Sequence, residues 1–211
     1  MSMAELLHGD SSQTRRQRLH GWVCRVAGVV LALLWIMGCA TDPTAAYFGD
    51  VQSKASVYVA PKADQVKKVA ILPFKAPTEL IGTSVSDLLL TELMRASRYE
   101  MVERGQMANV LSESELALAG LSSSKAAEVG HMLGAEGVII GTVDEYSTVA
   151  YRGHPYPVVG ISARLIDCQT GKIVWSVSLA ERAQDKELSL AEEGRIVIHE
   201  MTAALYNKWK P

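Results

Sequence analysis

The sequence predicts an α/β fold in which helices pack on a mixed β-sheet. Short apolar runs rich in β-branched residues alternate with amphipathic stretches, and turn residues separate them. The order of the segments is β-α-β-α-α-β-β-β-α, which is typical of a two-layer α/β domain. We expect this domain to span residues 67–211.

The first predicted strand covers residues 68–74 (KVAILPF), an apolar run that contains Pro73 near its end. An amphipathic helix follows, and Ser84 and Asp87 have the spacing of a capping box at its start. Its apolar face comprises Val85, Leu88, Leu89, Leu93 and Ala96. Residues 99–103 (YEMVE) alternate in polarity, so a second strand is expected there.

Two more helices precede the next strand. The first keeps the helical period at Met107, Val110, Leu111, Ser114 and Leu118. Ser122 to Ser124 offer N-caps for the second, and Gly134 stands where a left-handed residue is favoured after a helix. Residues 137–143 (GVIIGTV) then predict a strand.

Two strands and a helix complete the predicted domain. Residues 158–167 and 172–180 read as strands, and the four residues between them end in Gly171, which predicts a β-hairpin. The final helix carries an apolar stripe at Leu190, Gly194, Val197, Ile198, Met201 and Leu205. Residues 146–157 lie between two strands, and we expect a loop there.

The composition excludes two classes of protein. Lys and Arg number 21 against 23 Asp and Glu, so no basic excess exists to neutralise a nucleic-acid backbone. The chain has only three cysteines, too few for a disulfide scaffold. Adjacent carboxylates such as Glu192 and Glu193 point to different faces of an element, and we expect them on the solvated surface.

The N-terminal segment has the pattern of an export signal. Arginines precede the uncharged apolar run 26–37, which is shorter than the roughly 20 residues that a membrane-spanning helix needs. Cys39 follows this run, with the small Gly38 directly before it. We expect residues 1–38 to form a signal peptide and residues 39–66 to form a flexible tether, in which Val57 and Val59 could belong to a short edge strand.

The residues around Cys39 resemble the lipobox of bacterial lipoproteins. The resemblance implies cleavage between Gly38 and Cys39 and a covalent lipid on Cys39; no other cofactor is expected. No Asp stands directly after Cys39, where Ala40 is found, and by the same resemblance this implies a location on the periplasmic face of the outer membrane. The alternative is a structural cysteine that ends a hydrophobic helix.

We find no residues with the spacing of a catalytic or metal site. His131, His154 and His199 are far apart and fall on different predicted elements. Cys168 lies in a predicted turn beside Asp167, whose charge would raise the pKa of the thiol rather than activate it. We therefore predict that the protein is not an enzyme.

Aromatic residues are the candidates for a contact surface. Residues 146–157 contain three tyrosines and Arg152, and they form either a simple polar loop or a contact with a membrane interface or another subunit. Trp175 either packs in the core or is an exposed anchor. We predict that Tyr151 and Trp175 serve membrane or subunit contact more than folding.

Several short motifs, taken in order, resemble the CsgG-like family of outer-membrane lipoproteins. They are residues 69–74 (VAILPF), 102–104 (VER), 133–135 (LGA) with 137–141 (GVIIG), and 163–167 (ARLID) with 170–172 (TGK). The resemblance implies a periplasmic α/β domain that forms a homo-oligomeric ring. It also implies a non-enzymatic role in the export of an extracellular polymer, either a polysaccharide or fibre subunits.

Within this family, the sequence looks closer to the lipoproteins of Pel exopolysaccharide export than to the curli channel. The curli channel inserts two long hairpins into the membrane, whereas residues 146–157 are few and residues 181–187 (ERAQDKE) are almost wholly polar. This implies a partner role beside a separate outer-membrane porin. The alternative is a monomeric lipoprotein that regulates a cell-wall (peptidoglycan) synthase.

Overall fold

The computed structural model describes residues 43–48, 51, 53–61, 63–103, 105, 107, 109, 112 and 122–209. They belong to one compact unit, Pro43–Pro211. The predicted signal peptide, Gly38 and Cys39 lie outside the described residues. Within the described ranges, we find no helix that combines the length and the apolarity needed to cross a membrane.

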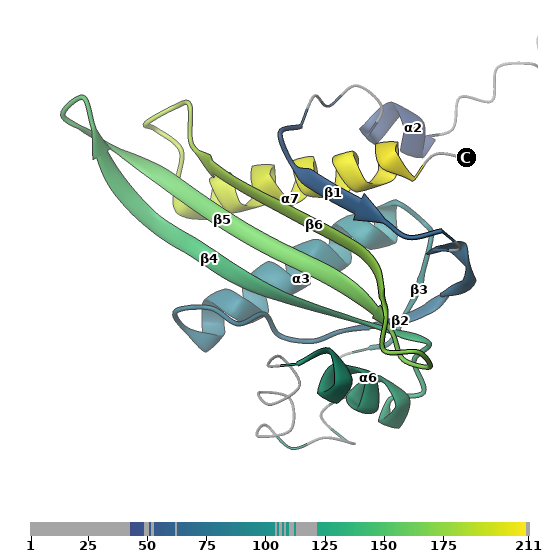
Figure 1. Cartoon of the computed structure of the whole chain (residues 1–211). Helices are drawn as coiled ribbons and strands as arrows, with labels where there is room; N and C mark the ends of the chain where they lie inside the picture. Colours follow the sequence, from purple (N-terminus) through teal and green to yellow (C-terminus); the bar gives the residue numbers. More distant parts are fainter. Residues whose placement is uncertain are drawn as a thin grey trace, which may run out of the picture. The chain divides into compact units, whose positions relative to one another are not determined.

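Six strands form one mixed sheet in the order β1-β6-β5-β4-β2-β3 (Figure 1). Their bounds are β1 Ser56–Val59, β2 Lys68–Ile71, β3 Glu100–Met101, β4 Gly137–Tyr151, β5 His154–Asp167 and β6 Ile173–Arg182. Strand β2 pairs in parallel with β3 and β4, and the other pairs are antiparallel. The predicted mixed sheet is thus confirmed, with β1 and β3 as its edge strands.

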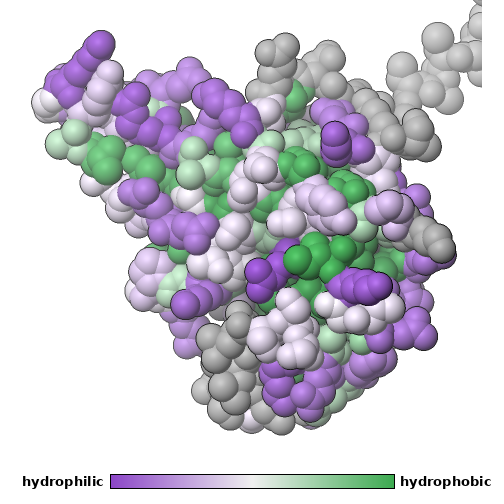
Figure 2. All heavy atoms as spheres, in the orientation of Figure 1, coloured by the Kyte–Doolittle hydropathy of each residue, from purple (hydrophilic) through white to green (hydrophobic). Residues whose placement is uncertain are grey.

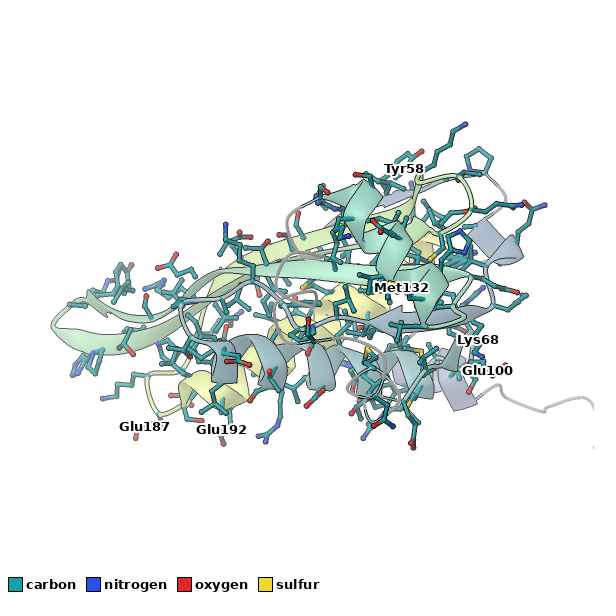
Figure 3. All side chains as sticks on the ribbon, turned by 90° about the horizontal axis from the view of Figure 1, so that it is seen from below. Tyr58, Lys68, Glu100, Met132, Glu187 and Glu192 are labelled. Atoms are coloured by element: carbon teal, nitrogen blue, oxygen red, sulfur yellow. The ribbon has the colours of Figure 1, made fainter. Side chains whose placement is uncertain are left out.

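The helices lie on both faces of this sheet. Their bounds are α2 Pro43–Phe48, α3 Glu79–Arg95, α6 Ser123–Met132 and α7 Leu190–Lys208, with a short 3-10 helix at Ala63–Gln65. Helices α3 and α7 cover one face, and α6 packs on part of the other (Figures 1 and 3). The two predicted layers are the sheet and the pair of helices α3 and α7. Helix α6 adds a partial third layer on the other face of the sheet.

Side chains of one strand alternate between two apolar clusters, as the period of a strand requires. On β2, Val69 and Ile71 belong to the cluster beneath α3 and α7. Ala70 and Leu72 belong to the cluster beneath α6. Residues 69–74 are apolar without a break, and both faces of the sheet are covered here.

The prediction of a loop at residues 146–157 is wrong. Strands β4 and β5 continue through this segment in one long hairpin, in register up to Tyr151 opposite His154. Its turn consists of Arg152 and Gly153, with φ values of 51° and 78°. Positive φ at both positions is the conformation that tight hairpins favour, because its twist matches that of the strands.

The helix boundaries confirm some of the expected caps and correct one. Helix α3 begins earlier than expected: Thr78 is its N-cap, and the Thr78 hydroxyl accepts a hydrogen bond from the Ile81 amide at 3.3 Å. Ser122 caps α6, and Gly134 has the left-handed φ of 64° that was expected after it. The helix predicted between Met107 and Leu118 lies largely outside the described residues.

The predicted tether, residues 39–66, is largely folded from residue 43 onward. Phe48 of α2 is fully buried against Tyr206 of α7, and the Asn207 side chain donates a hydrogen bond to the Phe48 carbonyl at 3.0 Å. The Tyr47 hydroxyl accepts a hydrogen bond from Arg95 of α3 at 2.7 Å. The expected strand at Val57 and Val59 is β1.

Candidate functional site

The three histidines considered as catalytic candidates do not come together in the structure. His131 lies on α6, His154 on β5 and His199 on α7, where its Nδ1 is 3.2 Å from Glu92 Oε2. Within the described ranges, no three His, Cys, Asp or Glu side chains gather so that they could hold a metal ion.

Cys168 is a buried free cysteine against α6, where it faces Gly130. Burial, and to a lesser extent the charge of Asp167, raises the pKa of Cys168 to about 11. The prediction that the charge of Asp167 raises the pKa of the Cys168 thiol is confirmed. The thiol is therefore protonated at neutral pH, and a protonated thiol is a poor nucleophile.

Trp175 belongs to the core, so its prediction as an exposed contact residue is wrong. The side chain is fully buried in the cluster beneath α3 and α7. Its indole Nε1 donates a hydrogen bond to the Tyr99 hydroxyl at 2.8 Å. A buried indole with a satisfied N–H serves folding rather than contact with a membrane or subunit.

Tyr151 lies at the end of the β4–β5 hairpin and is 41% exposed. The Arg182 guanidinium carbon lies 3.7 Å from the centroid of the Tyr151 ring, and the Tyr156 ring packs edge-on against it at 5.8 Å. Arg152 lies 5.2 Å from the same centroid. We call Tyr151, Arg152, Tyr156 and Arg182 the hairpin-tip cluster. Its rings and cations are accessible to a membrane surface or another subunit.

A second surface is the sheet face opposite α3 and α7, where α6 does not cover it. Small hydroxyl side chains are the most frequent on this open face. Figure 2 shows weakly polar and polar residues there beside hydrophobic ones. The residues follow from the strand register: Ser56 and Tyr58 on β1, Ser176 and Ser178 on β6, Ser162 and Arg164 on β5, and Thr142 on β4. Ile140 has the same orientation on β4 but is buried in the cluster beneath α6.

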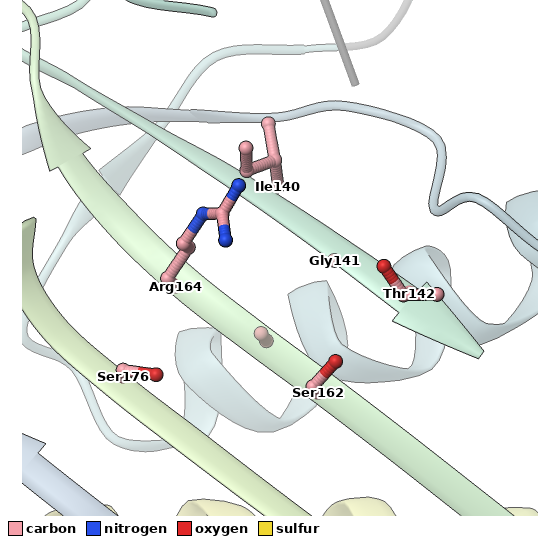
Figure 4. A pocket seen from close by; sticks show the side chains of 7 residues that line it. Ile140, Gly141, Thr142, Ser162, Arg164 and Ser176 are labelled. Carbon is pink, nitrogen blue, oxygen red and sulfur yellow. The ribbon is translucent and has the colours of Figure 1, made fainter. Parts of the chain in front are cut away.

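A cavity of about 60 Å³ opens on this face around Arg164. Figure 4 shows the Arg164 side chain beside Ile140, with Thr142, Ser162 and Ser176 on the same and neighbouring strands. The Nε of Arg164 is buried and has no hydrogen-bond partner. In the sequence, Arg164 is noticeable only as part of a family motif, because strand alternation does not show which sheet face stays uncovered.

Glu193 was expected on the surface, but it is only 3% exposed. Burial raises the pKa of Glu193, and the charges of Glu181 and Glu200 raise it further. Its neighbour Glu192 is exposed and completes the capping box of α7, in which its carboxylate accepts hydrogen bonds from the Ser189 amide at 2.8 Å and hydroxyl at 2.7 Å. These bonds lower the pKa of Glu192.

We expect the Glu193→Gln variant to be more stable than the wild type at neutral pH. The folded state holds the Glu193 proton to a higher pH than the unfolded state does, so this group makes stability fall as pH rises above about 4.3 through the raised pKa. Glutamine removes that loss, and urea unfolding at about pH 7 and about pH 4 measures it. The gain should disappear at the lower pH.

The matched control is Glu192→Gln, which should have the opposite effect. The lowered pKa of Glu192 contributes stability that is present above its ordinary pKa and is lost as pH falls through the lowered pKa. This variant should therefore be less stable than the wild type at neutral pH. If both variants changed stability in the same direction, the assignment of Glu193 as a buried, unfavourable charge would be wrong.

Comparisons with known proteins agree with this architecture. The family model described as "Curli production assembly/transport component CsgG" matches residues 49–205. The PelC dodecamer from Paraburkholderia phytofirmans is a similar solved structure, with a TM-score of 0.54 and 19% identity, over 73% of this chain and 98% of that chain. Lipoprotein GNA1162 from Neisseria meningitidis has a TM-score of 0.46 and 21% identity, over 58% of this chain and 87% of that chain.

The search of curated proteins finds no match. At identities this low, the likeness to PelC shows a common fold only. The family model, in contrast, runs from the segment before β1 almost to the end of α7. The chain therefore belongs to the CsgG family.

Proposed function

We propose that this protein is a lipid-anchored component of an export apparatus for an extracellular polymer. It acts without enzymatic activity on the periplasmic face of the outer membrane, beside a separate porin. The observation that carries the proposal is the order of parts in one chain: a lipobox-like leader that ends at Cys39, followed by a domain of a curli assembly and transport family. The polymer is a polysaccharide, such as Pel, or a fibre subunit.

We further propose that the working form is a homo-oligomeric ring. The support is the shared fold with PelC, which is a dodecamer in its crystals. The exposed Tyr151 ring of the hairpin-tip cluster is available for contacts beyond a single chain. A ring presents identical sites around a common axis, an arrangement suited to the passage of a polymer.

Deletion of the gene tests the export function. We expect the deletion strain to retain the polymer inside the cell envelope, while the cytoplasmic precursor of the polymer is still made. A plasmid copy of the full-length gene should restore release. If the deletion strain released normal amounts of every extracellular polymer but had a weakened cell wall, the regulator of a peptidoglycan synthase would be the better account.

The hairpin-tip cluster is the proposed second contact of the anchored domain, with either the membrane or another subunit. We expect Tyr151→Ala to lower the free energy of unfolding by about 1 kcal/mol or less, because the ring is exposed and loses mainly its contact with Arg182. The same variant should reduce polymer release or oligomerisation in cells. Thermal unfolding and a release assay measure the two effects.

Tyr151→Phe keeps the ring and is the matched control, so it should behave as the wild type in both assays. Normal release and normal oligomerisation by Tyr151→Ala would contradict the proposed contact.

A further inference from the structure

Arg164 has no counter-charge in the described part of the chain. It takes part in none of the ion pairs found there, and its Nε is buried without a hydrogen-bond partner. A buried N–H without an acceptor is costly, because water no longer satisfies it. The side chain lines a cavity on the open sheet face, so an anionic ligand in that cavity can pair with the guanidinium group, whose charge no described carboxylate neutralises.

The chemistry of the cavity favours a carboxylate. A guanidinium presents N–H groups in a planar fork that matches the two oxygens of a carboxylate. The cavity of about 60 Å³ has room for a group of that size, since water occupies roughly 30 Å³ per molecule in the liquid. Thr142, Ser162 and Ser176 line the same cavity, and each hydroxyl can both donate and accept a hydrogen bond.

The rest of the open face favours a hydroxyl-rich ligand over a protein. Serine is depleted in protein–protein interfaces, whereas Ser56, Ser162, Ser176 and Ser178 all belong to this face. Tyr58 pairs with Ser176 on the neighbouring strand and is 54% exposed, so its phenol is accessible beside them. Figure 3 shows Tyr58 at the margin of the sheet, turned outward.

We propose that the open sheet face binds a saccharide that carries a carboxylate, such as a uronic acid unit. Arg164 pairs with the carboxylate, and Thr142, Ser162 and Ser176 form hydrogen bonds with the sugar hydroxyls. This proposal rests on the proposed export function and names the chemical class of the polymer that the protein handles.

Saturation-transfer NMR on the full-length protein in detergent tests this site, with sodium glucuronate as the probe and glucose as its uncharged analogue. We expect saturable binding of glucuronate and binding of glucose that is about tenfold weaker or more. Arg164→Gln should weaken glucuronate binding by a similar factor. Arg164→Lys should retain part of the binding, because it keeps the charge but loses the planar fork.

Lys172→Gln is the matched control, since it removes the same charge from an exposed turn, and it should bind as the wild type does. Circular dichroism checks that each variant folds, which we expect because Arg164→Gln removes an unsatisfied donor. The proposal is overturned if the wild type shows no saturable glucuronate binding, or if Arg164→Gln or glucose gives the wild-type value.

A change in oligomer mass without any effect on sugar binding would assign Arg164 to a contact with a second copy, and this result too would overturn the proposal. The export function is tested separately by gene deletion. It would therefore stand even if no glucuronate bound.

Discussion

Replacing Trp175 with alanine is expected to destabilise the domain by about 3–5 kcal/mol, which is the usual cost of truncating a buried aromatic side chain. The indole is fully buried, and its removal also leaves the Tyr99 hydroxyl without its N–H donor. For a chain of this length, the loss corresponds to a melting temperature lower by roughly 6–20 °C. Thermal and urea unfolding of the purified protein measure it.

Ile173→Ala is the matched control, because Ile173 lies on the same strand but is 41% exposed. We expect it to change the free energy of unfolding far less than Trp175→Ala. A Trp175→Ala variant with the wild-type melting temperature would show that the indole is not part of the core.

Replacing Cys39 with alanine is expected to abolish lipid attachment completely. A single acyl chain binds a membrane reversibly, whereas two or three chains, at about 0.8 kcal/mol per buried methylene, make the anchor effectively permanent. Cells that are fed a clickable fatty acid should label the wild type but not Cys39→Ala. The variant should also leave the outer-membrane fraction.

Cys168→Ala is the control for this experiment, because it removes a thiol that is buried in the folded domain. It should label as strongly as the wild type. Equal labelling of Cys39→Ala and the wild type would remove the basis for a lipid-anchored protein.

The sequence predicted the central elements of the fold because their apolar periods are strong. Strands β2, β4, β5 and β6 and helix α7 were all expected, and Gly134 and Gly171 adopt the positive φ that their turns require. The hairpin tip was missed because the prolines and tyrosines of residues 146–157 are more typical of a loop. Its turn, Arg152-Gly153, is also not one of the strongest hairpin signals.

The burial of individual side chains was harder to predict than the elements that carry them. Trp175 alternates with Ser176 and shares a strand face with Val177, so the period of two already favoured a core position. Glu193 lies one helical turn before the buried Val197 and shares its face. At both positions the period of the element, rather than the residue type, indicates the burial.

The exposure of Arg164 and the folding of the segment around Phe48 depend on the tertiary structure. Strand alternation separates Arg164 from Leu165, but only the positions of α3, α6 and α7 determine which face stays open. Phe48 lies in a segment without sustained periodicity, and it folds because α7 offers it an apolar contact. No local pattern carries that information.

The mass of the full-length protein, purified in detergent, tests most directly whether the protein works as a ring. The account predicts one discrete homo-oligomer with several times the mass of a single chain, both for the wild type and for Arg164→Gln. A single-chain mass under all detergent conditions would contradict the ring and would favour a monomeric regulator of a cell-wall synthase.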